Sequence, residues 1–227
     1  MAGVPNGFAP CLALLYHDAS MTRVLYLHGF ASSPASRKAQ LLRERFAGVG
    51  VNLEIPDLEE GSFRNLTLSG QLRVIERTLQ GEPAHLIGSS MGGYLATLYA
   101  ARHPEVQRLV LLAPAFGFVR RWAKAVGAKA LEDWRTTGSM GVFHYGTGEF
   151  RPLGWGLMED ALKYEDEPAV EQPALVWHGL QDDVVPVQAA RLFVMHNQHA
   201  RLIEVTSGHE LTEVAEQIAD GAVEFLR

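Results

Sequence analysis

The chain has 227 residues, 47% of them hydrophobic, and a formal net charge of −6 at pH 7. This length and composition predict one domain with one substantial core, and the acidic balance argues against nucleic acid as a partner. No run of basic residues indicates binding to a membrane surface. The single cysteine excludes an internal disulfide and fits a reducing compartment, so we expect a cytoplasmic protein.

Residues 1–20 show no clear strand or helix period and contain two glycines and two prolines. We expect them to form an N-terminal extension, followed by a single domain over residues 21–227. The apolar run at 8–16 is too short to span a bilayer and no Lys or Arg precedes it, so a signal peptide is the less favoured interpretation.

Downstream of residue 22, short apolar runs alternate with segments of helical periodicity, which is typical of a parallel sheet with crossover helices. We expect strands at 23–28, 51–55, 84–88, 107–112, 174–178 and 201–205. We expect helices at 68–79, 91–103, 187–197 and 211–226, and another that begins at Pro34 with Ser33 as its N-cap. The predicted fold class is therefore α/β, with a mostly parallel central sheet flanked by helices.

This alternation stops after Pro114, and no strongly apolar strand follows until residue 174. So long an excursion within a compact domain is usually functional. We expect a small cap inserted at about 115–170. Its predicted elements are a helix near 118–134, an irregular or hairpin segment near 141–154, and a helix near 156–164.

The pentapeptide G-x-S-x-G occupies residues 88–92, with Ser90 at its centre. It lies between an apolar strand and a helix-like stretch, where a sharp strand-to-helix turn would expose the serine. Glycines on either side allow neighbouring backbone to pass where a Cβ would clash. The motif and its context predict a nucleophile elbow.

A serine nucleophile needs a base and an acid, and candidates follow in the order Ser, Asp, His. His209 is the preferred base because it follows the last predicted strand in a Ser-Gly-His turn. Asp182 or Asp183, after the strand at 174–178, is the acid; the residues alone leave the two open, although only one can face His209. Because each candidate follows a strand, all would meet at the carboxyl edge of a parallel sheet.

Backbone N–H groups are needed to stabilise the oxyanion of an acyl-transfer intermediate. The N–H of Met91, the residue after Ser90, is one expected donor because it begins a helix. The N–H of Phe30 is the other, since Gly29 allows close backbone approach at the end of the first strand. We expect His28 and His178 to be structural.

The expected cap is rich in aromatic residues, which line an apolar pocket over Ser90 or form the core of the cap itself. We take the following residues as candidates for substrate binding: Phe116, Phe118, Trp122, Trp134, Phe143, Tyr145 and Trp155. No charged cluster suggests a carboxylate or phosphate clamp, so an uncharged ester of apolar groups is favoured. The run that begins at His209 lacks the second histidine of the zinc motif H-E-x-x-H, and no metal site or cofactor is predicted.

These motifs resemble the alpha/beta-hydrolase superfamily over residues 22–227. The segments 24–34 (VLYLHGFASSP) and 88–94 (GSSMGGY) are similar to those of small bacterial serine esterases of the YqiA-like group. The superfamily pattern H-G-x-x-D-x-x-V-P matches residues 178–186, and the resemblance thereby implies Asp182 as the acid. It also implies a carboxylesterase that acts on a small ester through an acyl-enzyme.

Other activities share the same triad and remain open: a thioesterase, a lactone or C–C bond hydrolase, and an aminopeptidase. Haloalkane dehalogenases use an aspartate nucleophile, and Ser90 argues against them. The alternative from outside the enzymes is a receptor that binds a ligand and does not turn it over, because a fold alone does not establish catalysis.

Overall fold

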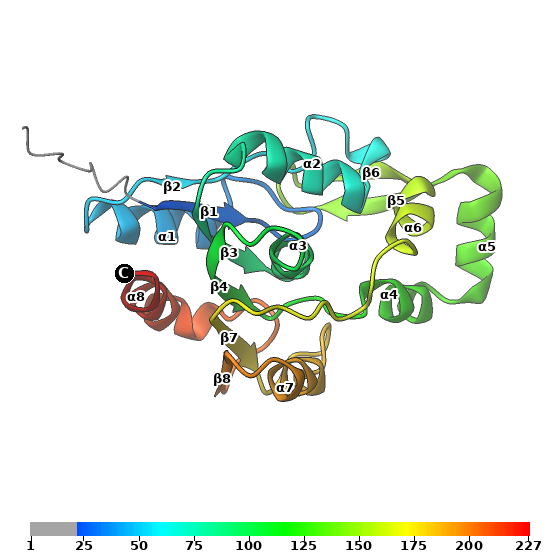
Figure 1. The fold of residues 1–227 in the computed structure, drawn as a ribbon. Helices are drawn as coiled ribbons and strands as arrows, with labels where there is room; N and C mark the ends of the chain where they lie inside the picture. Colours follow the sequence, from blue (N-terminus) through cyan, green and yellow to red (C-terminus); the bar gives the residue numbers. More distant parts are fainter. Residues whose placement is uncertain (1–21) are drawn as a thin grey trace, which may run out of the picture.

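The computed structural model describes residues 22–227, so the expected extension over residues 1–20 lies outside the described residues (Figure 1). Six strands form a sheet in the order β2-β1-β3-β4-β7-β8, and every neighbouring pair is parallel. The strands are β1 (Arg23–Leu27), β2 (Leu53–Glu54), β3 (Ala84–Ser89), β4 (Val106–Leu112), β7 (Ala174–Gly179) and β8 (Ala200–Val205). The α/β class predicted from the sequence is confirmed.

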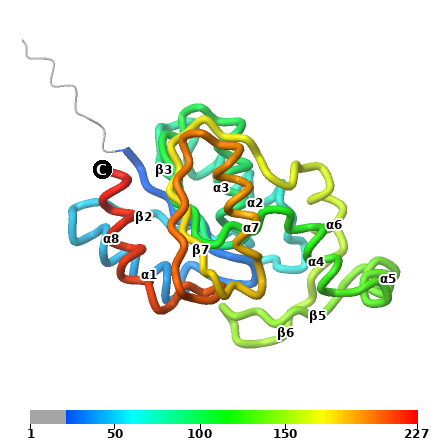
Figure 2. The backbone as a smooth tube through the Cα atoms, turned by 90° about the horizontal axis from the view of Figure 1, so that it is seen from below, coloured from blue at the N-terminus to red at the C-terminus, as the bar shows by residue number. Residues whose placement is uncertain are grey.

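Helices cover both faces of the sheet (Figures 1 and 2). On one face lie α1 (Arg37–Ala47) and α8 (Ala215–Leu226), and on the other lie α2 (Leu68–Leu79), α3 (Met91–Ala100) and α7 (Val187–His196). Successive side chains of a strand point to opposite faces of the sheet, so they pack into different cores. Leu25 and Leu27 pack with α2, α3 and α7, whereas Tyr26 packs with α1 and α8.

Two helix starts differ from the prediction. The N-cap of α1 is Ser36 rather than Ser33, and its hydroxyl accepts a hydrogen bond from the Ala39 N–H at 3.4 Å. The Ser33 carbonyl instead accepts from the Ser36 N–H at 3.1 Å, which forms a turn before the helix. Similarly, the last predicted helix begins as a short 3-10 turn, η2 (Thr212–Val214), because Leu211 has a left-handed backbone.

The segment between β4 and β7 extends to one side of the sheet (Figure 1). We call residues 115–170 the cap segment. It contains α4 (Phe118–Val126), α5 (Ala128–Thr137), the antiparallel pair β5 (Ser139–His144) and β6 (Glu149–Gly154), and α6 (Gly156–Ala161). The single helix predicted at 118–134 is two helices, because Gly127, with φ +83° and ψ 154°, interrupts it.

Within residues 22–227, no helix combines the length and apolar character that a membrane crossing requires.

Candidate active site

Ser90 lies between the end of β3 and the start of α3, with φ 53° and ψ −115°. This conformation is strained for a non-glycine residue and persists only where the surroundings impose it. Close backbone contacts on both sides provide that constraint. A Cβ on Gly92 would stand 2.0 Å from the Leu27 carbonyl oxygen, and one on Gly88 would stand 2.3 Å from the Gly92 oxygen.

The imidazole of His209 lies between the serine and a carboxylate. Its Nε2 is 3.0 Å from Ser90 Oγ, and its Nδ1 is 2.8 Å from Asp182 Oδ2. An ionised carboxylate only accepts hydrogen bonds, so Nδ1 carries the proton and Nε2 is left to accept from the serine hydroxyl. The three side chains come from the loops after β3, β7 and β8, and the structure brings them together at the carboxyl edge of the sheet.

The side chain of Asp182 is fully buried, whereas the neighbouring Asp183 is exposed. The N–H groups of Val184 and Val185 donate to Asp182 Oδ1 at 2.9 and 2.7 Å. Burial opposes the charged form, but hydrogen bonds from His178, His209 and the Val185 N–H outweigh it and hold the pKa of Asp182 well below its usual range. Between the two aspartates that the sequence left open, the structure therefore directs Asp182 toward His209.

His178 is fully buried beneath this loop. Its Nε2 donates to the Val185 carbonyl at 2.7 Å and lies 3.2 Å from Asp182 Oδ2. The side chain thus supports both the backbone of the acid loop and the carboxylate itself.

The two expected oxyanion donors belong to segments close to Ser90. Met91 is the first residue of α3, and a Cβ on Gly29, the residue before Phe30, would lie 3.5 Å from Ser90 Cβ. Among residues 22–227, neither the Met91 N–H nor the Phe30 N–H donates to another backbone group. Both are therefore available to an oxygen placed beside the serine.

The seven aromatic residues fall into three groups. Phe118 and Trp122 on α4 are half-buried, with ring centres 6.4 and 4.9 Å from that of Phe30. Three others belong to cores: Phe116 stacks on Phe193, and Trp155 packs against Trp134, whose Nε1 donates to the Leu153 carbonyl.

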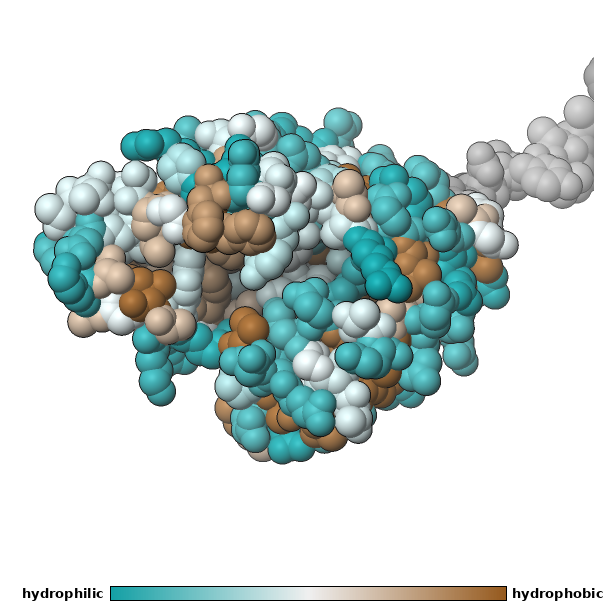
Figure 3. Space-filling model, turned by 180° about the vertical axis from the view of Figure 1, so that it is seen from behind, coloured by the Kyte–Doolittle hydropathy of each residue, from teal (hydrophilic) through white to brown (hydrophobic). Residues whose placement is uncertain are grey.

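The last two, Phe143 and Tyr145, lie on the β5–β6 hairpin and are 39% and 77% exposed. Seen from behind, the molecule is hollowed near its centre, with apolar residues at the border toward the cap segment (Figure 3).

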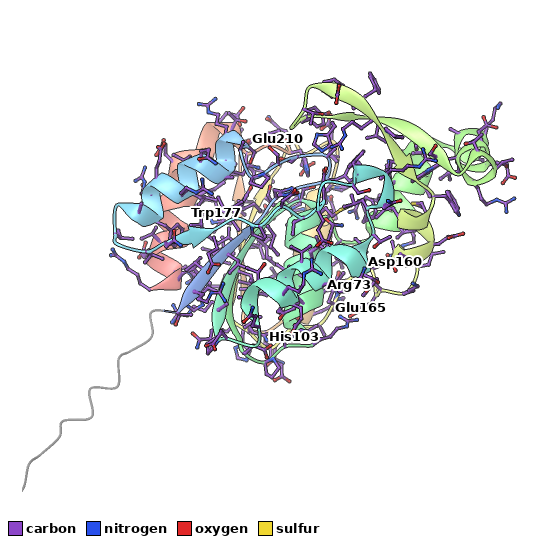
Figure 4. The ribbon with its side chains drawn as sticks, turned by 90° about the horizontal axis from the view of Figure 1, so that it is seen from above. Arg73, His103, Asp160, Glu165, Trp177 and Glu210 are labelled. Carbon is purple, nitrogen blue, oxygen red and sulfur yellow. The ribbon has the colours of Figure 1, made fainter. Side chains whose placement is uncertain are left out.

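Sequence reasoning missed Lys38, a mostly buried lysine behind the elbow. Its Nζ donates to Ser89 Oγ at 3.1 Å and lies 3.9 Å from a carboxylate oxygen of Glu210, which is labelled near α1 in Figure 4. Burial lowers the pKa of Lys38, and the charges of Glu210 and Asp182 partly oppose this. No sequence signal joins these positions, because they meet only in the folded chain.

A parallel sheet, a strained serine between strand and helix, and the order Ser, Asp, His together define an alpha/beta hydrolase. The chain belongs to the Uncharacterised protein family (UPF0227), whose model matches residues 23–226. This match confirms the resemblance inferred from the sequence.

Two curated relatives carry hydrolase names. Monoacylglycerol lipase abhd6-B of Xenopus laevis is 28% identical over 84% of this chain and 56% of its own length, so the chain spans about half of that relative. The AB hydrolase superfamily protein YisY of Bacillus subtilis (strain 168) is 25% identical over 82% of this chain and 84% of its own.

Solved structures share the fold at lower identity. Est1E from Butyrivibrio proteoclasticus has a TM-score of 0.73 at 20% identity, with 90% of this chain and 86% of that chain covered. The Paleococcus ferrophilus monoacylglycerol lipase has a TM-score of 0.71 at 19% identity, with 90% and 95% covered.

Proposed function

We propose that the protein is a serine carboxylesterase in which Ser90, His209 and Asp182 form the catalytic triad. The observation that carries this proposal is the continuous hydrogen-bonded series from Ser90 Oγ through His209 to Asp182, at 3.0 and 2.8 Å. The hydrolase and lipase names of the relatives support an ester-cleaving enzyme.

In the first half of the reaction, Ser90 Oγ attacks the ester carbonyl while His209 Nε2 takes the hydroxyl proton. Asp182 keeps the imidazole in the reactive tautomer and stabilises the imidazolium. The low pKa of Asp182 suits this role, because the carboxylate stays ionised throughout. Collapse of the tetrahedral intermediate breaks the ester C–O bond, and His209 returns the proton to the leaving alcohol.

The carbonyl oxygen becomes negatively charged during attack. The N–H groups of Met91 and Phe30 donate to it, and the N-terminal end of α3 adds a favourable dipole. In the second half, water attacks the acyl-enzyme while His209 takes one of its protons. The bond between the acyl carbon and Ser90 Oγ then breaks, and His209 gives the proton to Oγ as the acid leaves.

The aromatic side chains of Phe30, Phe118 and Trp122 supply an apolar surface next to the oxyanion donors. These side chains are better placed to contact an apolar acyl or alcohol group than Trp134, which is buried, or Tyr145, which is exposed on the hairpin. A thioesterase or a lactone or C–C bond hydrolase would use the same triad, and nothing at the site favours one of these over an ester.

A fluorophosphonate probe tests the nucleophile. We expect wild-type protein and Ser89→Ala to be labelled and Ser90→Ala to remain unlabelled. A panel of nitrophenyl esters from acetate to palmitate, with one acyl-CoA and one peptide amide, then defines the class of substrate. Absence of labelling in folded wild-type protein would favour the receptor without turnover.

A further inference from the structure

One face of α4 is directed at the proposed oxyanion loop. Phe118 and Trp122 lie four residues apart on the helix and both contact Phe30. Arg121 lies three residues after Phe118, so its side chain is a neighbour of Phe118 on the helix surface. The cap segment thus presents one arginine among the aromatic residues at this site.

The Arg121 side chain extends back toward the start of its helix. A Cβ on Gly117 would lie 3.1 Å from Arg121 Nη1. Gly117 is two residues from Ala115, whose N–H donates to the Ser90 carbonyl at 2.9 Å. The charges of Asp166 and Asp182 both act on the guanidinium. Arg121 therefore lies beside the loop after β4, near enough to Asp182 to feel its charge.

This guanidinium has no partner of its own among residues 22–227. Its Nη2 is buried without a hydrogen bond, and it forms no ion pair there. The two nearby carboxylates are already engaged: Asp166 pairs with Arg120 at 2.7 Å, and Asp182 receives hydrogen bonds from His209 and the acid loop. Arg121 is partly buried as a whole, but a buried guanidinium nitrogen without a partner is costly and calls for an acceptor that the described residues do not supply.

We propose that Arg121 binds a carboxylate carried by the substrate at a distance from the scissile ester. The inference rests on the proposed esterase function and refines its substrate class. Phe118 and Trp122 cover the apolar chain, and the planar guanidinium receives its anionic end. A carboxylate fits better than a phosphate dianion, because one cation faces the ligand while Asp166 and Asp182 would repel a second negative charge. The proposal differs in this respect from the uncharged ester that the sequence favours.

Matched esters test the proposal. On the acyl side, mono-4-nitrophenyl adipate is compared with 4-nitrophenyl hexanoate; on the alcohol side, the hexanoyl ester of 4-hydroxybutanoate is compared with butyl hexanoate. We expect Arg121→Gln to lower kcat/KM for the carboxylate member of one pair about 10- to 100-fold and to change its neutral partner less than about twofold. Lys124→Gln, which removes an exposed cation from the same helix α4, is the matched control and should leave both ratios unchanged.

The inference would be overturned if Arg121→Gln left the ratio of kcat/KM between charged and neutral esters unchanged in both pairs. It would also be overturned if the folded variant lost kcat/KM equally for charged and neutral esters. If wild-type protein cleaves none of the esters, the proposed function fails separately. Calorimetry with the unreactive amides then decides: adipate monoamide should bind at least about tenfold more tightly than hexanamide to wild-type protein, and equally to Arg121→Gln. Equal binding of the two amides to wild-type protein would also overturn the inference.

Discussion

The carboxylate of Asp182 contacts the imidazole of His209 through one oxygen and the backbone of its own loop through the other. Oδ2 lies 2.8 Å from His209 Nδ1, while Oδ1 accepts from the N–H groups of Val184 and Val185. The backbone therefore fixes the orientation of the carboxylate independently of the histidine. This separation makes the acid testable by a substitution that preserves its shape.

Asp182→Asn should lower kcat about 10,000-fold with little change in KM, because an amide stabilises the wrong imidazole tautomer and carries no charge. Asp183→Asn is the matched control, since Asp183 is exposed and should tolerate the change within about twofold. Steady-state kinetics on one nitrophenyl ester provides both values. A large loss in Asp183→Asn with normal Asp182→Asn would reassign the acid.

Gly92→Ala should disrupt the elbow. The new Cβ would stand 2.0 Å from the Leu27 oxygen and 2.7 Å from the His28 oxygen, and this backbone at the end of β1 cannot shift without disturbing the sheet. We expect a loss of about 3 kcal/mol in the free energy of unfolding, at the upper end of the usual cost of overpacking, together with loss of probe labelling.

Gly156→Ala is the counterpart, because nothing lies within 4 Å of its Cβ position. It should raise stability by about 0.4–1 kcal/mol, since alanine reduces the entropy of the unfolded chain. Urea denaturation measures both variants, and equal stability of Gly92→Ala and wild-type protein would contradict the packing argument.

The sheet was predictable because its strands are short apolar runs buried on both faces: all six residues of β3 and of β7 are buried. The helices of the cap segment were less predictable from the sequence. Helix α4 has no buried residue and α5 has one, so burial does not mark where these two helices end, and Gly127 divides what the sequence predicted as one helix.

The candidate site shows the same contrast. Ser90 and His209 follow strands in motifs of their own, but the choice between Asp182 and Asp183 depends on the path of one loop. No sequence pattern identifies Lys38 or Arg121. The burial of Lys38 beside Ser89 and the unpaired nitrogen of Arg121 result from contacts between segments that are distant in the chain.

His85 should make the protein less stable in mild acid. Burial, with the nearby charge of Arg108, lowers the pKa of His85 to about 4. In the unfolded chain a histidine titrates at about 6.5, so between these values the unfolded state binds more protons. Stability should therefore fall as the pH decreases from about 6.5 to about 4. His85→Val should lose less stability over this range in urea titrations at pH 7.0, 5.5 and 4.5.

The exposed His199 is the control for His85, and His199→Val should follow the wild-type pH dependence. If His85→Val and wild-type protein lost equal stability on acidification, His85 would not be the group responsible.

Asp160 joins the cap segment to the body of the protein. This residue of α6 accepts hydrogen bonds from the backbone N–H and the hydroxyl of Ser69, both at 2.7 Å, at the first turn of α2 (Figure 4). Asp160→Asn should cost about 1–3 kcal/mol, because the two donors contact different oxygens and the amide nitrogen that replaces one of them cannot accept. Lys163→Gln is the control: Lys163 pairs with Asp160 at 2.8 Å but is largely exposed, so its loss should change stability little.

The pH dependence separates this contact from simple packing. Burial alone would raise the pKa of Asp160, but hydrogen bonds from Lys163 and Ser69 outweigh it and lower the pKa. The stabilisation is therefore present above the unfolded value of about 4 and is lost as the pH falls through the folded value. The stability difference between wild-type protein and Asp160→Asn should shrink between pH 5 and pH 3. A difference that stayed constant would show that the carboxylate charge contributes nothing to holding α6 against α2.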